Sequence, residues 1–132
     1  MITGVHALIY SDDAEATRAF LRDVLRWPSL DAGDGWLIYK SGPSELGVHP
    51  TTVEFTDPDG KHEVYESQRQ HQISLVCDDL EATIAELAGR GARFTREVRD
   101  EGYGLTIELD VPGADPILLY QPRHPLALNL PD

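Results

Sequence analysis

The sequence predicts an α+β fold made of two βαβββ modules in tandem, and an internal repeat carries most of this prediction. Residues 13–21 read Asp-Ala-Glu-Ala-Thr-Arg-Ala-Phe-Leu and residues 79–87 read Asp-Leu-Glu-Ala-Thr-Ile-Ala-Glu-Leu, so six of nine positions are identical at an offset of 66 residues. The offset is half of the 132-residue chain, which fits a duplicated unit. Chance similarity between two amphipathic helices is the alternative. The flanks argue against chance, because an apolar run precedes each segment and strand-like segments follow it.

Each copy of the repeat is expected to contain a capped amphipathic helix. Asp13 and Asp79 stand where an N-cap belongs, and Glu15 and Glu81 fall in the first turn, where a negative charge is favourable. Pro28 is expected to end the first helix, and the glycines at 89 and 91 the second. Apolar residues recur at helical spacing in both segments: Ala16, Ala19, Phe20, Val24 and Trp27 in the first, and Leu80, Ile84, Leu87 and Ala88 in the second.

Strand-like segments follow each helix, so each half is expected to read βαβββ. Turn-forming residues at 41–44 and 112–115 separate the last two strands of each half. The expected strands lie near Leu30, at 35–40 and at 45–49 in the first half, and at 93–98, 105–111 and 117–120 in the second.

This pattern divides the chain into residues 1–50 and 71–122, the two modules, with residues 51–70 between them and a proline-rich tail at 123–132. The connecting segment has alternating apolar residues on both sides of Asp57-Pro58-Asp59-Gly60, which is typical of a hairpin. A flexible linker is the alternative at this point.

Composition narrows the classes of function. The chain has 23 acidic and 11 basic residues and a formal charge of −12, so a nucleic-acid backbone would be repelled. No apolar stretch is long enough to span a membrane, and no signal peptide is recognised. Cys77 is the only cysteine, which excludes a disulfide and favours a reducing cytoplasm.

The repeated module resembles the vicinal oxygen chelate superfamily, the glyoxalase/bleomycin-resistance/extradiol-dioxygenase group. The resemblance runs from Gly4 to Pro122 and is carried by Ser11-Asp12-Asp13 before the first helix and by Val76-Cys77-Asp78-Asp79-Leu80 before the second. It implies two half-open, curled sheets that form one cleft, with the helices outside. It also implies that modules pair within one chain or by exchange between two chains, so a homodimer is compatible with it.

The resemblance further implies a divalent metal (iron, manganese, nickel or zinc) held by a histidine and a glutamate from each module. His6 and Glu45 match the first module. In the second module Gln72 replaces the histidine and Leu118 the glutamate, and Leu118 cannot coordinate a metal. His49 is the best replacement ligand, so His6, Glu45 and His49 are the candidate set. The alternative is that these side chains only line a cleft.

Four further residues are expected to contact a ligand: Tyr10, Trp36, Gln72 and Tyr103. Three functions follow from the sequence. The chain binds a small molecule in the cleft without an intact metal site, or it is a metal-dependent lyase, isomerase, transferase or ring-cleaving dioxygenase, or it is a non-catalytic accessory protein. The incomplete metal set favours the first.

Overall fold

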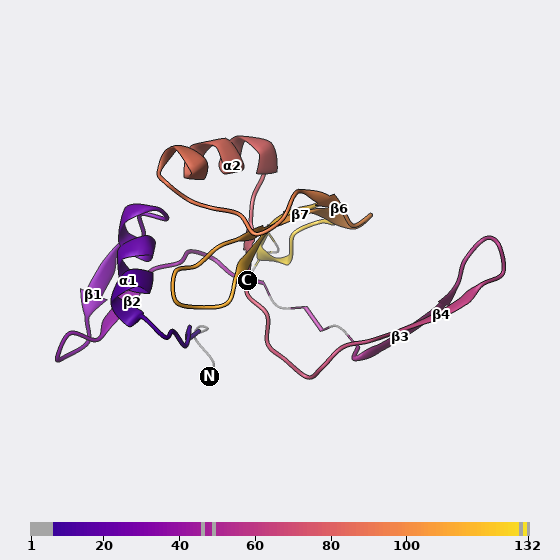
Figure 1. The fold of residues 1–132 in the computed structure, drawn as a ribbon, viewed down its shortest axis with the longest axis horizontal. Coiled ribbons are helices and arrows are strands. Elements are labelled where there is room, and N and C mark those ends of the chain that lie inside the picture. The colour runs from indigo at the N-terminus through magenta and orange to yellow at the C-terminus, as the bar shows by residue number, and fades with distance from the viewer. Residues whose placement is uncertain (1–6, 46, 49, 130, 132) are drawn as a thin grey trace.

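A computed structural model describes residues 7–45, 47–48, 50–129 and 131 (Figure 1). The chain is α+β, with two helices and several small sheets that do not close into a barrel, so the predicted fold class is confirmed. Neither described helix is long and apolar enough to cross a membrane. The elements follow the order α1 (Ala14–Asp23), β1 (Ser29–Asp31), β2 (Leu37–Tyr39), β3 (Thr52–Thr56), β4 (His62–Glu66), β5 (Ser74–Val76), α2 (Leu80–Gly89), β6 (Arg99–Asp100), β7 (Gly104–Leu109), β8 (Ile117–Pro122) and a short 3-10 helix η1 (Ala127–Asn129).

The second copy of the repeat forms a four-stranded sheet with the order β5-β8-β7-β6. Strands β5 and β8 are parallel and are separated in the chain by α2, β6 and β7, and the remaining pairs are antiparallel. Helix α2 lies over one face of this sheet (Figure 1). Its first turn is tied to the sheet, since the Leu80 N–H donates to Gln121 Oε1 of β8 at 2.7 Å.

The first copy forms helix α1 beside the two-stranded antiparallel sheet β1-β2. The hydroxyl of Tyr39 on β2 lies 3.4 Å from the Arg18 carbonyl oxygen of α1. Both predicted N-caps are confirmed, because Asp13 accepts from the Ala16 N–H at 3.1 Å and Asp79 accepts from the Ala82 N–H at 3.0 Å. The two helices therefore start in the same way, as the repeat predicts.

Three expected strands differ from the structure, and the first of them is the one before α1, whose described residues 7–10 lie in no strand. Glu45, Gly47 and Val48 lie in no strand, and Val48 is almost fully exposed. Pro43 and Pro50 on either side of this segment have no N–H to donate to a ladder, and Gly47 within it weakens a strand. The strand expected at 93–98 is reduced to a single bridge, Phe94 with Leu109, before the chain bends and pairs again in β6.

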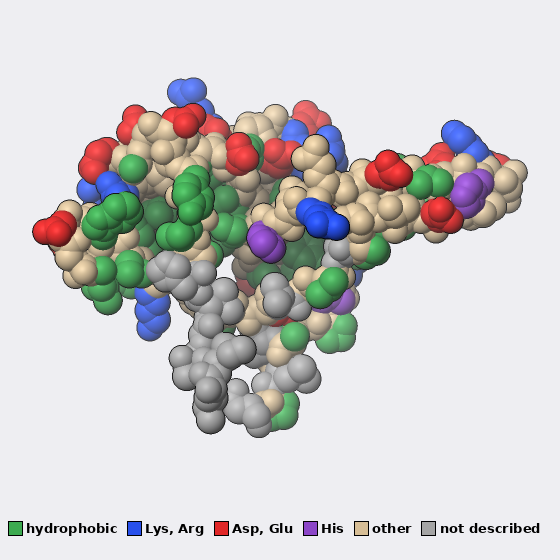
Figure 2. Space-filling model, turned by 90° about the horizontal axis from the view of Figure 1, so that it is seen from below, with side chains coloured by type: hydrophobic (Ala, Val, Ile, Leu, Met, Phe, Trp, Pro, Cys, Tyr) green, Lys and Arg blue, Asp and Glu red, His purple; other side chains and the backbone are tan. Residues whose placement is uncertain are grey.

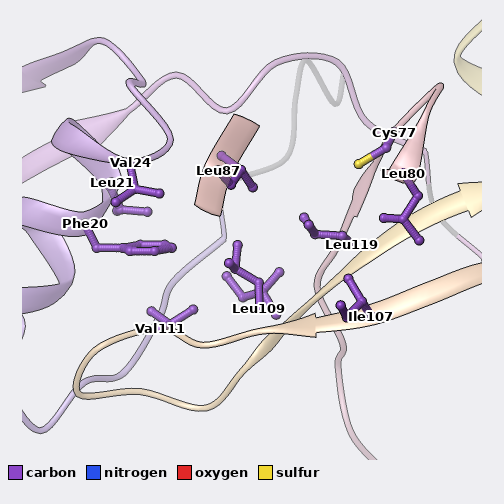
Figure 3. Packing of buried hydrophobic residues seen from close by; sticks show 11 residues of the cluster. Phe20, Leu21, Val24, Cys77, Leu80, Leu87, Ile107, Leu109, Val111 and Leu119 are labelled. Carbon is purple, nitrogen blue, oxygen red and sulfur yellow. The ribbon is translucent and has the colours of Figure 1, made fainter. Parts of the chain in front are cut away.

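The two copies share one hydrophobic core (Figure 3). In Figure 3, side chains of α1 point towards Leu87 of α2 and towards the sheet residue Leu109 and the adjacent Val111. The buried apolar residues of this core are Phe20, Leu21, Val24, Cys77, Leu80, Leu87, Ile107, Leu109, Val111, Ile117 and Leu119. Burial of residues from both copies in one cluster joins the halves into a single packed body.

A polar junction reinforces this core. The turn after β7 docks on the start of α1, where the Asp12 N–H donates to the Gly113 carbonyl oxygen at 2.7 Å and the Thr17 hydroxyl donates to the Pro112 carbonyl oxygen at 2.6 Å. Gly113 has φ +81°, and a Cβ at this position would lie 2.6 Å from Ser11 Oγ. Glycine is therefore required for the turn to come this close.

Candidate functional site

One face of the four-stranded sheet is turned away from the core. Cross-strand partners lie on the same face of a sheet, and the buried pair Ile107–Leu119 marks the core side. The alternate positions of β7 and β8 therefore share the opposite face, which we call the open face: Thr106, Glu108, Leu118 and Tyr120.

Three aromatic rings gather at one end of the open face, and we call Tyr103, Tyr120 and His124 the aromatic site. The Tyr103 and Tyr120 rings meet edge to face with centroids 5.9 Å apart, and the His124 ring lies 5.7 Å from Tyr120. Tyr103 is 60% exposed, so one ring of the pair is presented to solvent. A Cβ on Gly104 would lie 2.5 Å from Cε2 of Tyr120, so only glycine leaves room for this ring. The pair forms an apolar surface on which a planar group can stack.

A carboxylate borders the aromatic site. Glu45 Oε2 accepts from the Ala127 N–H of η1 at 2.7 Å, which ties the 45–48 segment to the C-terminal tail. Burial raises the pKa of the Tyr120 hydroxyl, and Tyr103 and Glu45 raise it further. Tyr120 therefore stays neutral near pH 7 and keeps a proton that it can donate to a ligand.

The other end of the open face is charged but internally paired. Arg96 Nε lies 3.2 Å from Glu108 Oε1, and Arg96 Nη2 donates to the Thr106 hydroxyl at 2.9 Å. The Thr106 hydroxyl also donates to Glu101 Oε1 at 3.2 Å. Because the Arg96 guanidinium already bonds to Glu108 and Thr106, it stabilises the open face and is not free to bind an anion.

The predicted ligand contacts fall in separate places. Tyr103 belongs to the aromatic site. Tyr10, 87% exposed, lines a shallow hollow of about 430 Å³ beside Asp12 and Asp110. Trp36 is exposed in the turn between β1 and β2, and Gln72 is exposed just before β5.

The described residues do not assemble the metal set that the superfamily implies. His6 and His49 lie outside the described residues. Glu45, the described candidate, accepts a backbone N–H, and position 118 carries a leucine on the open face. Within the described ranges no group of three or more His, Cys, Asp or Glu side chains is placed to hold a metal ion. The set of His6, Glu45 and His49 therefore stays a prediction, and no chemical step through a metal is derived.

Cys77 is a packed thiol within the core. It is 8% exposed, and its Sγ lies 3.7 Å from the Leu75 carbonyl oxygen. Burial raises the pKa of this thiol, which disfavours the nucleophilic thiolate. The cysteine is therefore a packing residue of the core.

Sequence reasoning missed Tyr120 and His124 as site residues. Tyr120 had a usable signal, because it shares strand parity with Leu118, the position that the superfamily pattern assigns to the cleft. His124 had none, since it follows the last strand. The Arg96–Glu108 pair also required the strand register, which the sequence does not contain.

An open mixed sheet with an outer helix, a duplicated helix motif and an exposed aromatic pair characterise this α+β fold. A family model for the Glyoxalase/Bleomycin resistance protein/Dioxygenase superfamily matches residues 4–116, and the chain belongs to this superfamily. No curated protein matches the chain.

Solved structures share the fold at low sequence identity. A glyoxalase/bleomycin resistance protein/dioxygenase superfamily member from Sphaerobacter thermophilus is 19% identical, with a TM-score of 0.51 over 91% of this chain and 98% of its own. Lactoylglutathione lyase from Agrobacterium tumefaciens is 16% identical, with a TM-score of 0.54 over 90% and 96%. TnmS3, an antibiotic-binding protein from Streptomyces sp. CB03234, is 17% identical, with a TM-score of 0.50 over 92% and 99%.

Proposed function

We propose that this protein binds a small organic molecule at the aromatic site without a metal. The observation that carries the proposal is the exposed Tyr103 ring, held edge to face against Tyr120 above Gly104. Stacking on this pair suits a ligand with a planar, largely apolar part, and the Tyr120 hydroxyl suits a hydrogen-bond acceptor on it. Tyr10, Trp36 and Gln72 stay predicted as outer contacts of a ligand that extends beyond the pair.

Two further observations support binding over catalysis. The buried Cys77 thiol has a raised pKa, and the Arg96 guanidinium is engaged by Glu108 and Thr106. The described open face therefore offers stacking and hydrogen bonding, and no activated nucleophile. The antibiotic-binding protein TnmS3 shares the fold, which supports a binding role for this scaffold. The alternative is a divalent-metal-dependent lyase, isomerase or dioxygenase that uses His6 and Glu45.

The proposal predicts that Tyr103→Ala weakens binding of a planar aromatic probe. A neutral anthraquinone serves as the probe, and titration calorimetry measures its Kd. Loss of one stacking ring is expected to raise the Kd about tenfold. Gly104→Ala is expected to weaken binding while keeping both rings, because its Cβ would displace the Tyr120 ring.

Tyr65→Ala is the matched control, since it removes a similarly exposed tyrosine from the β3–β4 hairpin, away from the aromatic site, and is expected to change the Kd by less than about threefold. Elemental analysis, with thermal shifts in manganese, iron, nickel and zinc, tests the alternative. If neither Tyr103→Ala nor Gly104→Ala changes the Kd for the anthraquinone, the proposed site is contradicted. Micromolar metal binding that His6→Ala abolishes would instead support the metal-dependent function.

A further inference from the structure

The segment that follows β8 runs from the aromatic site to Glu45. It comprises residues 124–129, and we call it the strap. The His124 ring lies 5.7 Å from the Tyr120 ring, and further along the Ala127 N–H donates to Glu45 Oε2 at 2.7 Å. Unlike the β3–β4 hairpin, which projects from the body in Figures 1 and 2, the strap therefore lies against the body.

The chain is firmly held immediately before the strap. The Arg123 N–H donates to the Tyr103 carbonyl oxygen at 2.9 Å, and the Arg123 guanidinium bonds to both carboxylate oxygens of Asp100, at 2.6 and 2.9 Å. These bonds fix the start of the strap beside the aromatic site. The strap can therefore move about this point while β8 and the rest of the sheet stay in place.

The far end of the strap depends on a single hydrogen bond. The Ala127 N–H is the first of η1 and has no acceptor within the helix, so Glu45 supplies the acceptor from the first copy. Between residues that the structure describes, no other hydrogen bond joins the strap to the body, since the bond of His124 Nδ1 with the Pro125 carbonyl oxygen is internal. No described strap residue belongs to the hydrophobic core or packs against it. One hydrogen bond contributes little net free energy, so the strap is held only weakly.

In this position the strap covers part of Tyr120. The Tyr120 ring is partly buried, with Tyr103 edge-on to it and the His124 ring tilted against it by 47°. Tyr103 itself is 60% exposed, so the two rings of the pair are not equally open. A planar ligand that stacks on Tyr120 would have to compete with the His124 ring. Pro125 restricts the backbone of His124 to extended conformations, so this ring is expected to leave Tyr120 only when the strap moves as a whole.

We propose that the strap is an autoinhibitory cover, which the Glu45–Ala127 hydrogen bond holds over Tyr120 and which a ligand displaces. This inference rests on the proposed binding at the aromatic site. With the strap displaced, the rings of both Tyr103 and Tyr120 are available for stacking. The measured affinity is then the intrinsic affinity reduced by the fraction of molecules in which the strap is open. Any change that breaks the Glu45–Ala127 bond raises this fraction and tightens binding.

Ala127→Pro tests the proposal, because it removes the donor of this bond and leaves every ring of the aromatic site in the chain. Proline suits the position, since Ala127 is the first residue of η1 and Leu126 before it is not helical. The Kd for the neutral anthraquinone, measured by titration calorimetry, is expected to fall about three- to tenfold. Glu45→Ala removes the acceptor and is expected to have a similar effect. The double variant should bind no more tightly than either single variant, because both substitutions break the same bond.

Ala127→Gly is the matched control, because it changes the same residue and keeps the N–H, and it is expected to leave the Kd within about twofold of wild type. Proton NMR of the His124 imidazole gives a second measurement that needs no ligand. In the wild type the neighbouring Tyr120 ring shifts these resonances, and in Ala127→Pro the shift is expected to shrink as the strap opens.

An Ala127→Pro variant that binds the anthraquinone no more tightly than the wild type would overturn the autoinhibitory role. So would His124 resonances that are the same in both proteins, because the strap would then stay in place without the Glu45–Ala127 bond. If neither the wild type nor any variant binds the anthraquinone, the proposed function itself fails, and the autoinhibitory role fails with it.

Discussion

Thr17 has a role that its repeat partner Thr83 does not share. Both hydroxyls lie near the carbonyl oxygen of the residue four positions earlier, Asp13 at 3.3 Å and Asp79 at 2.8 Å. Thr17 is in addition 5% exposed and donates to Pro112 of the other copy. Thr83 therefore bonds within its own copy, whereas the equivalent Thr17 links the two copies.

This difference predicts unequal costs for the same substitution. Thr17→Val keeps the shape but leaves the Pro112 carbonyl without this donor in a part-buried place, so it is expected to cost about 1–3 kcal/mol of unfolding free energy. Thr83→Val is expected to cost less than about 1 kcal/mol, because its hydroxyl bonds to the Asp79 carbonyl oxygen and contacts the Cys77 thiol, both in its own copy of the repeat. Urea unfolding of both variants measures the difference. Equal losses would show that the junction carries no special stability.

Single residues also show how far the sequence could predict the site. Asp13 and Asp79 were predictable as caps, because a cap depends on neighbours three residues away. The contact of Tyr103 with Tyr120 was not, because it depends on the register of β7 against β8. A residue type indicates what a side chain can do, and only the pairing of strands indicates what it meets.

At the scale of elements, an ion pair fastens the β6–β7 turn to the end of β8. Arg123 holds both carboxylate oxygens of Asp100, at 2.6 and 2.9 Å, and also donates to the Gly102 carbonyl oxygen. The Arg123 guanidinium, followed by the Gly102 N–H, lowers the pKa of Asp100 from 3.8 to about 2. This bidentate pair spans strands that lie next to the aromatic site, so it holds Tyr103 in position.

The lowered pKa predicts a pH-dependent contribution with a definite sign. A carboxyl whose pKa is lower in the folded state stabilises the fold above its unfolded pKa, near 3.8, and loses that effect as the pH falls through about 2. A double-mutant cycle of Asp100→Asn and Arg123→Gln measures it by urea unfolding. The coupling is expected to be favourable near neutral pH and to be lost as the pH falls below about 2. Because Asp100 and Arg123 are both exposed, the coupling energy is expected to be small even at neutral pH. A coupling that persists below about pH 2 would show that the two side chains do not interact as an ion pair.

The predicted elements were right where the pattern was local and wrong where distant contacts decide. Both helices and the alternation in 52–66 depend on residues close in sequence. The 45–48 segment was predicted as a strand, but the Glu45 side chain instead accepts a hydrogen bond from the Ala127 N–H of the C-terminal tail. The chain after Phe94 bends because Arg96 turns back to Glu108 of β7. Neither partner is recognisable from the sequence around these segments.

At the scale of the molecule, the repeat produces one body and not two. Phe20, Leu21 and Val24 of the first copy lie in the same core as Leu109 and Leu119 of the second (Figure 3). The Arg90 guanidinium at the end of α2 also donates to the Val24 carbonyl oxygen at the end of α1, at 2.9 Å. Separating the copies would expose the apolar faces of both, so neither copy is expected to be stable alone.

Because the core is shared, a destabilising substitution in the core of one copy is expected to destabilise the other copy as well. Both tryptophans, Trp27 and Trp36, lie in the first copy, so their fluorescence reports on its unfolding. Leu109, 0% exposed, belongs to the second, and Leu109→Ala is expected to lower the unfolding free energy by about 2–5 kcal/mol.

Because the halves unfold together, the tryptophan transition in urea is expected to shift by the same amount as the circular dichroism transition, at one fixed protein concentration. Val98→Ala, at an exposed apolar position of the second copy, is the control and should move neither transition. If Leu109→Ala shifts the circular dichroism signal alone, the two copies unfold independently, and the shared core does not couple them.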